Sequence, residues 1–186
     1  MNTSSDNRIG SLACTSNMLC TGSKNGIVSV YDFRQNKSVA SWKAHEQEIC
    51  GIKWSHDGQM IASGGNDNKM SLFSLKTMTR MAEFSQHKAA VKALAFDPHS
   101  PMIATGGGSA DKCLRFFSTQ TLQEIYSKDT GSQICNILFS PVSQELVTTH
   151  GFSLNQINVY KVNKDSKAIK TSTLTGHKCR VLYLAG

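Results

Sequence analysis

Apolar and polar residues alternate along most of this chain in short runs of about five or six positions, a usual strand length. Such alternation is typical of a β-strand with one buried face, whereas a helix would repeat its apolar residues every three to four positions. Clear examples are Ile49–Trp54, Val91–Phe96 and Ile134–Phe139. No segment shows a competing helical period, so we predict an all-β protein.

The pattern predicts four strands in each of four successive units. Tight polar turns such as Ser55-His56-Asp57-Gly58 separate first strands from second strands. The predicted strands are 9–14, 18–21, 27–32 and 38–42; 49–54, 60–62, 69–75 and 80–84; 91–96, 102–105, 113–117 and 123–126; and 134–139, 145–148, 156–162 and 168–174.

The units repeat with a step of 42 to 46 residues, measured from His45 to His87, then to Gly131 and then to His177. A period of about 40 to 45 residues with four strands per unit is typical of a β-propeller blade. We therefore predict one domain over 1–186, an incomplete WD-repeat β-propeller. Its repeats are approximately 8–43, 45–86, 87–130 and 131–176, and 177–186 begins another blade.

Small residues form a turn at a similar place in three units, at 63–68, 105–111 and 149–152. We expect Gly64 and Gly65 to adopt turn conformations with positive φ. A phosphate-binding P-loop is excluded, because 106–112 lacks a second glycine before its lysine and leads into a strand instead of a helix.

Two aspartates precede predicted third strands and can accept hydrogen bonds from the histidines that open the same repeats. We expect His45 with Asp67, and His87 with Asp111, to be structural pairs of the blade turn and not acid–base pairs. The histidines show no metal-ligand spacing, and no nucleophile elbow accompanies them. The sequence thus predicts a protein without a metal, a cofactor or an enzymatic activity.

Composition narrows the class of protein further. Of the 186 residues, 39% are apolar and 18% are charged, which is ordinary for a globular domain. No run approaches 18 apolar residues, and the polar stretch 1–8 does not resemble a signal peptide. The six cysteines contain no C-x-x-C pair, which disfavours zinc and redox motifs. We expect the protein in the cytoplasm and nucleus, with no membrane partner.

The net charge is +7, and part of the excess lies in the stretch 161–180. A basic stretch of this kind can meet nucleic acid or an acidic peptide. No aromatic residues interleave with its lysines as binding of single strands would require. We favour a solvated loop and outer strand, and expect no nucleic-acid partner.

The two ends leave the predicted propeller open. The chain begins inside a first strand, and we predict that 181–186 forms the first strand of another blade. An open stack of blades exposes strand edges and an apolar face. We therefore expect either a piece of a longer propeller or a truncated product that is poorly stable alone.

Several strings, in order from about residue 8 to residue 185, resemble the Fizzy and Fizzy-related family of WD-repeat proteins. They include Glu-Ile-Cys-Gly-Ile-Lys-Trp at 48–54, Gly-Gly-Asn-Asp-Asn at 64–68, Gly-Ser-Gln-Ile-Cys at 131–135, Thr-His-Gly-Phe at 149–152 and Gly-His at 176–177. Asn-Asp-Asn after two glycines and Thr-His-Gly-Phe are the most specific to that family. The resemblance implies about four blades of a ring of about seven.

Members of this family are co-activators of the anaphase-promoting complex, a ubiquitin ligase that acts in cell division. The resemblance implies an adaptor that recruits substrates by their KEN and destruction-box peptides and meets ligase subunits and checkpoint-type inhibitors. Four residues match positions that bind KEN peptides in the family, namely Asn66, Ser109, Gln133 and Arg180. Amide groups can hydrogen-bond a peptide backbone, and an arginine can pair with a glutamate carboxylate.

The chain also departs from the family pattern. The aromatic that closes each third strand is usually tryptophan in WD repeats, but here the residues are Tyr31, Phe73, Phe117 and Tyr160. Further blades, an N-terminal C-box and an Ile-Arg tail, which the family uses, are not found, so we do not expect this chain alone to activate the ligase. A generic WD-repeat scaffold without degron recognition is the alternative.

Overall fold

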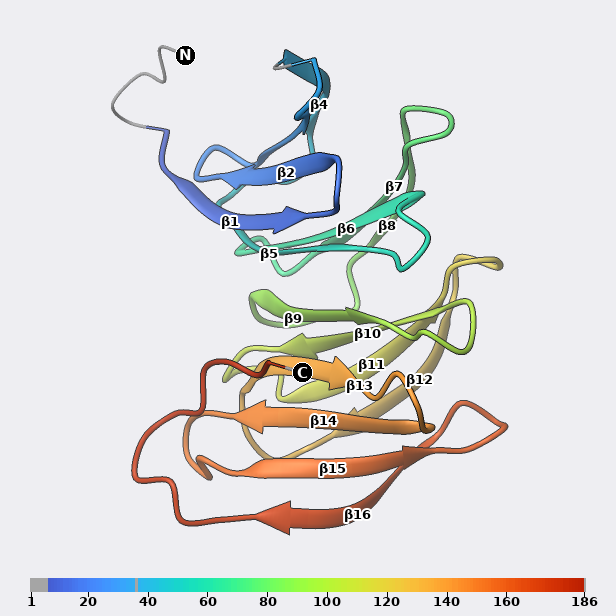
Figure 1. Ribbon diagram of the computed structural model, residues 1–186. Helices are drawn as coiled ribbons and strands as arrows, with labels where there is room; N and C mark the ends of the chain where they lie inside the picture. The colour runs from blue at the N-terminus through green and yellow to red at the C-terminus, as the bar shows by residue number, and fades with distance from the viewer. Residues whose placement is uncertain (1–6, 36, 186) are drawn as a thin grey trace. The chain divides into compact units, whose positions relative to one another are not determined.

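The computed structural model of the chain describes residues 7–35 and 37–185. Within these residues all regular structure is strand, in four separate antiparallel sheets of four strands each (Figure 1). The prediction of an all-β protein is confirmed. The part of the chain that the structure describes has no helix of a length and apolarity that could cross a membrane.

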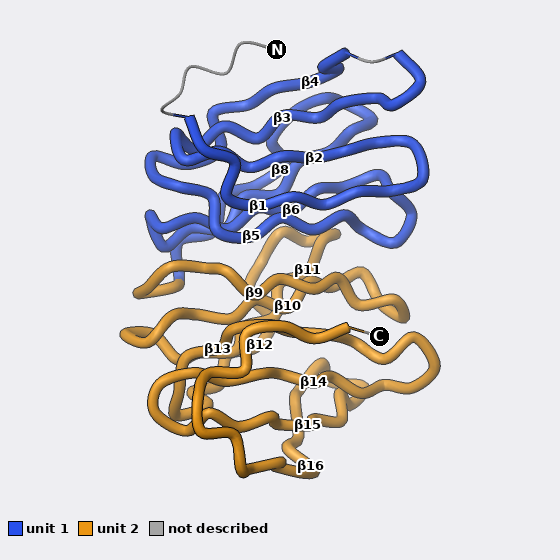
Figure 2. Tube along the Cα trace, turned by 60° about the vertical axis from the view of Figure 1, so that its left-hand side comes forward, with its two compact units in different colours: residues 1–86 blue, residues 87–186 orange. Residues whose placement is uncertain are grey.

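The chain divides into two compact units, 1–86 and 87–186 (Figure 2). In unit 1, residues 1–86, the sheet orders are β1-β2-β3-β4 and β5-β6-β7-β8, and β1 lies beside β5. The strands are β1 Ile9–Cys14, β2 Met18–Ser23, β3 Ile27–Asp32, β4 Lys37–Lys43, β5 Ile49–Trp54, β6 Met60–Gly65, β7 Met70–Ser74 and β8 Thr79–Phe84.

Unit 2, residues 87–186, has the sheet orders β9-β10-β11-β12 and β13-β14-β15-β16, and β9 lies beside β13. Each sheet is thus a sequential antiparallel meander, which requires only tight hairpin connections. The strands are β9 Val91–Phe96, β10 Met102–Gly107, β11 Cys113–Ser118, β12 Glu124–Asp129, β13 Ile134–Phe139, β14 Glu145–His150, β15 Ile157–Val162 and β16 Ala168–Leu174.

Each unit has its own apolar core between its two sheets. In unit 1, Ile49, Ile61 and Phe73 are fully buried in one cluster with residues of β2 and β3. In unit 2, Phe116 and Tyr160 are fully buried in a second cluster. Of the four aromatic residues that close third strands, Phe73 and Tyr160 therefore fill the cores, although they lack an indole N–H, whereas Tyr31 is only half-buried.

The second strands are longer than the sequence pattern predicts, and the expectation for Gly64 and Gly65 is wrong. Both glycines lie inside β6, and neither has a positive φ; the positive φ of this turn, 66°, belongs to Asn68. Gly65 is needed for space. A methyl group on Gly65 would lie 2.5 Å from the Asp67 carboxylate and 2.6 Å from Nδ1 of His45.

The prediction of a further first strand at 181–186 is also wrong for its described part, 181–185, which is not in a strand. Val181 is anchored by an N–H that donates to the carbonyl of His150 over 3.1 Å, and the ring of Tyr183 has Nζ of Lys92 at 5.3 Å from its centroid. The first strand of a blade forms most of its backbone hydrogen bonds with the second strand of the same blade. No described segment supplies that second strand for 181–185. Of the polar stretch 1–8, residues 1–6 lie outside the described residues.

Candidate functional site

The blade turn of the second sheet contains a buried histidine–aspartate pair. Nδ1 of His45 lies 2.9 Å from the Asp67 carboxylate, and Nε2 lies 2.8 Å from the hydroxyl of Ser63. The same carboxylate accepts backbone N–H groups of Glu46 and Lys69. The buried side chains of His45, Ser63 and Asp67 are thereby all paired, which is what burial requires.

The third sheet repeats this arrangement with His87, Asp111 and Thr105. The ring of His87 lies 2.7 Å from the carboxylate on one side and 2.7 Å from the threonine hydroxyl on the other. Burial raises the pKa of Asp111, but the hydrogen bonds from His87 and from the N–H of Lys88 outweigh it and bring the pKa to about 2. Each histidine thus lies between a carboxylate and a hydroxyl, as in a catalytic triad. Ser63 and Thr105 are both fully buried, so neither hydroxyl is accessible to a substrate, and the two arrangements fix turns.

The fourth sheet builds its turn differently, around the buried His150. Its Nδ1 lies 2.9 Å from the hydroxyl of Ser132, and its Nε2 lies 2.7 Å from Thr148 and 3.0 Å from the amide of Asn158. Burial lowers the pKa of His150 to about 4. This histidine is therefore neutral at pH 7 and serves as a hydrogen-bonding hub.

Asn66 and Ser109 are both exposed in the connections that follow second strands. The Oδ1 of Asn66 accepts a hydrogen bond from the thiol of Cys50 over 2.9 Å, and its backbone N–H donates to Glu48. This leaves the amide N–H₂ of Asn66 as the group that it can offer to a ligand. Asn66 belongs to unit 1, and the other three candidate residues belong to unit 2.

The structure brings Gln133 and Arg180 together over Gly151. The position that a methyl group on Gly151 would take is 3.0 Å from Oε1 of Gln133 and 2.9 Å from Cδ of Arg180. The backbone of this region is tied, because Gly151 N–H donates to the carbonyl of Gln133 and Gln133 N–H donates to that of Phe152. The amide oxygen of Gln133 and the aliphatic stem of Arg180 thus converge over the buried Gly151. Gln133 is half-buried and Arg180 is exposed.

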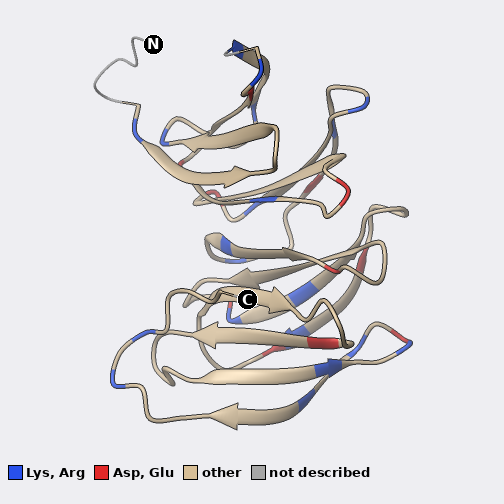
Figure 3. Cartoon of the chain, in the orientation of Figure 1, with Lys and Arg blue, Asp and Glu red and all other residues tan. Residues whose placement is uncertain are grey.

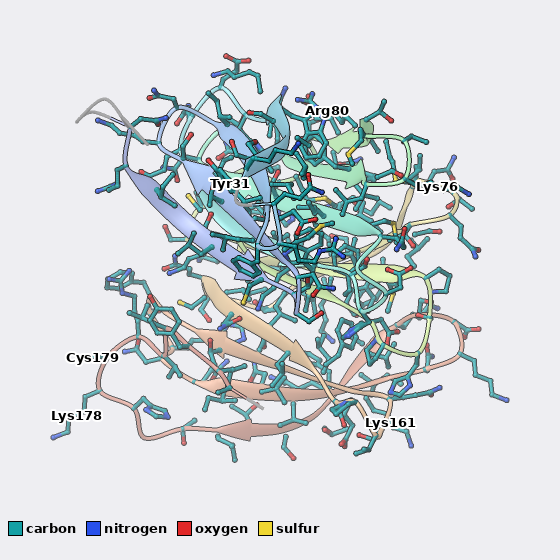
Figure 4. All side chains as sticks on the ribbon, turned by 45° about the horizontal axis from the view of Figure 1, so that its top comes forward. Tyr31, Lys76, Arg80, Lys161, Lys178 and Cys179 are labelled. Carbon is teal, nitrogen blue, oxygen red and sulfur yellow. The ribbon has the colours of Figure 1, made fainter. Side chains whose placement is uncertain are left out.

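The segment after β16 supplies further positive charge, as Figure 3 shows along the connection that follows this strand. Figure 4 shows Lys178 and Cys179 projecting away from the sheet on this connection. The lysines of the basic stretch are exposed, as are Lys178 and Arg180 themselves. Among the described residues, no group of three His, Cys, Asp or Glu side chains could hold a metal ion.

Two features of this site escaped the sequence reasoning. The packing of Arg180 on Gly151 and Phe152 joins residues about 30 positions apart, which no local pattern reveals. The central role of His150 was also missed. The only available signal was the family-specific string Thr-His-Gly-Phe at 149–152, which contains all three of the residues His150, Gly151 and Phe152.

Sequential four-stranded meanders with His–Asp turns define a protein of the WD-repeat propeller class. A family model described as the CDC20/Fizzy WD40 domain matches residues 1–186. The chain belongs to this family, as the resemblance in its sequence indicated.

Proteins of plants and of a slime mould are also similar to this chain in sequence. The chain is 46% identical over 180 residues to Protein FIZZY-RELATED 1 of Arabidopsis thaliana, with 96% of this chain and 37% of that protein covered. It is 40% identical to the Arabidopsis protein named Cell division cycle 20.1, cofactor of APC complex, covering 96% and 40%. The Dictyostelium discoideum anaphase-promoting complex subunit cdh1 is also 40% identical, with 96% and 28% covered.

A chain in a crystal structure of the mitotic checkpoint complex has the same fold, with a TM-score of 0.89 and 34% identity. The match covers 95% of this chain and 56% of that one. The chain thus spans between about a quarter and just over half of the lengths of these relatives, and it corresponds to part of their WD40 propeller.

Proposed function

We propose that this chain is the degron-binding part of a substrate-recruiting activator of the anaphase-promoting complex, an adaptor without an active site of its own. Membership of the CDC20/Fizzy WD40 family supports the proposal. So do relatives that are named as a cofactor or a subunit of that complex.

The observation that carries the proposal is the convergence of Gln133 and Arg180 over Gly151. A guanidinium offers a planar set of donors that matches a carboxylate, and an amide can both donate and accept hydrogen bonds. A peptide with a glutamate beside an amide-bearing residue, such as a KEN degron, fits these two groups. We further infer that Asn66 and Ser109 contribute hydrogen bonds to the same class of peptide.

The partners follow from this chemistry. We propose degron-bearing cell-cycle substrates, checkpoint-type inhibitors that present similar peptides, and subunits of the ligase, with the protein in the cytoplasm and nucleus. We propose no nucleic-acid partner, because no aromatic residues interleave with the lysines of 161–180 as binding of single strands would require. We propose no membrane partner either.

Fluorescence anisotropy with a labelled peptide that contains Lys-Glu-Asn tests the proposal. We expect saturable binding that Arg180→Ala weakens about tenfold or more, since hydrogen bonds to charged groups contribute about 1.5 to 3 kcal/mol. Lys178→Ala is the matched control, because it removes an exposed cation two residues away. A peptide with three alanines in place of Lys-Glu-Asn controls for nonspecific charge attraction.

A flat titration of the folded chain would contradict degron recognition. It would favour the alternative, a WD-repeat scaffold that keeps only other protein contacts. Circular dichroism at the titration temperature distinguishes this outcome from a chain that has not folded.

A further inference from the structure

Phe152 is a large apolar side chain that remains 59% exposed in the connection between β14 and β15. Its ring is not isolated. The guanidinium carbon of Arg180 lies 4.9 Å from the ring centroid, within the range of a cation–π interaction. One face of the ring therefore carries the charged end of a residue that we place in the degron-binding site.

The segment that bears Arg180 is anchored on both sides. Before it, the amide of Asn155 donates to the carbonyl of Lys178 over 3.3 Å, and after it, the N–H of Val181 donates to His150 over 3.1 Å. The stem of Arg180 passes over Gly151, where any side chain would displace it. Backbone anchoring and stem packing fix where the side chain starts, and the ring of Phe152 contacts its far end.

Comparison with the second sheet shows why the glycine matters. The backbone N–H of Gly151 donates to Gln133, just as the N–H of Asn66 donates to Glu48 in the equivalent turn. The second sheet places an asparagine side chain at this position, whereas the fourth sheet leaves it empty and an arginine from a distant segment crosses it. The third sheet also has a glycine at this position, Gly108, but the atoms next to it belong to Ala89 and Ala90. The packing of Arg180 on the glycine is therefore particular to the fourth turn among these three.

We propose that Phe152 is a positioning residue for Arg180, which holds the guanidinium flat on its ring with its N–H edges turned toward a peptide carboxylate. The stacked arginine loses less side-chain freedom when the peptide binds, so the ring raises the affinity for peptides with a glutamate. This inference rests on the function proposed above.

The test measures the Kd of the Lys-Glu-Asn peptide for the whole chain and its variants. Phe152→Leu keeps an apolar side chain but removes the ring, and we expect the Kd to rise about two- to fivefold. Phe152→Tyr keeps the ring and should restore the Kd of the unmodified chain. Phe33→Leu is the matched control, because Phe33 is similarly exposed, at 53%, and belongs to unit 1 between β3 and β4.

A double-mutant cycle separates positioning from direct contact. If Phe152 acts through Arg180, Phe152→Leu has no further effect on the Kd in an Arg180→Ala background. An equal loss in both backgrounds would overturn the proposal, because the ring would then act independently of the arginine. If Arg180→Ala itself leaves the Kd unchanged, the proposed function is wrong and not only the role of Phe152.

A second measurement does not depend on any peptide. A ring beneath the guanidinium shifts the NMR signals of the Arg180 side chain upfield, and Phe152→Leu should move them back. Unchanged Arg180 signals would overturn the positioning role even if the peptide binds. A chain that shows the ring-current shift but binds no peptide would contradict the proposed function, and with it the effect of Phe152 on affinity.

Discussion

His150 of β14 occupies the register position that Gly107 occupies in β10. Each residue pairs with the first residue of the preceding strand, Ile134 in one sheet and Val91 in the other. Gly107 leaves space for the carboxylate of Asp111, which a methyl group would contact. In the fourth sheet the imidazole of His150 itself fills the equivalent space, so one side chain replaces a histidine–aspartate pair.

Because His150 replaces the histidine–aspartate pair, the stability of the fourth sheet depends on pH. The pKa of His150 is about 4 in the folded chain, because burial disfavours the charged form, against 6.5 for an ordinary histidine. As the pH falls, the unfolded chain therefore protonates this histidine before the folded chain does. The stabilisation that comes from the neutral, buried His150 is complete above pH 6.5 and is lost as the pH falls toward 4. We expect the free energy of unfolding to fall by roughly 3 kcal/mol over this window from this group.

Urea unfolding between pH 7 and pH 4 measures this dependence. In His150→Gln, which keeps hydrogen-bonding groups but cannot be protonated, the slope between pH 6.5 and pH 4 should be shallower. His56→Gln, at an exposed histidine, is the control. The same slope in His150→Gln and in the unmodified chain would show that His150 is not the titrating group.

Asp111→Asn should destabilise the chain by about 2 kcal/mol. The carboxylate accepts hydrogen bonds from His87 and the backbone N–H of Lys88, and an amide group in its place would turn a donor toward one of them. Thermal or urea unfolding measures the loss. Asp165→Asn, in the exposed turn between β15 and β16, should change stability by less than about 0.5 kcal/mol. Equal effects at both positions would contradict a structural role for the pair.

Tyr126→Phe should cost about 1 kcal/mol, because it removes one hydrogen bond that joins two sheets. The hydroxyl of Tyr126, in β12, donates to the carbonyl of Ala168, in β16, over 3.1 Å. The comparison is Tyr183→Phe, whose ring is 75% exposed. If both variants unfold at the same urea concentration as the unmodified chain, this hydrogen bond does not stabilise unit 2.

Gly151→Ala should weaken binding of the Lys-Glu-Asn peptide about tenfold, or about 1.4 kcal/mol, with little change in melting temperature. The added methyl group would lie within 3.0 Å of both Gln133 and Arg180, whose flexible side chains can move away and lose their shared position. Gly58→Ala is not a suitable control because its φ is +68°; Ala110→Ser, at an exposed residue, is better. Unchanged affinity in Gly151→Ala would mean that this convergence does not form the site.

The alternation of apolar and polar residues was enough to predict the strands. β1, β3, β5, β9, β13 and β16 have the predicted bounds. In β3, for example, Val28 and Val30 are buried and alternate with less buried residues, which the apolar–polar pattern of the sequence shows directly. The glycines at the ends of β6 and β10 misled the prediction. Glycine favours turns locally, but here it allows a carboxylate and an imidazole to approach the strand, which is a tertiary requirement.

The sequence by itself determined the fold class, the blade repeat, the family and the identity of the candidate residues, since all of these are carried by local periodicity and short strings. Only the tertiary structure decided how those residues are held. It brought Arg180 across Gly151 onto Phe152 and placed His150 where the second and third sheets have Gly65 and Gly107. Contacts between residues about 30 positions apart depend on the packing of a strand connection against a later segment, and no local pattern specifies them.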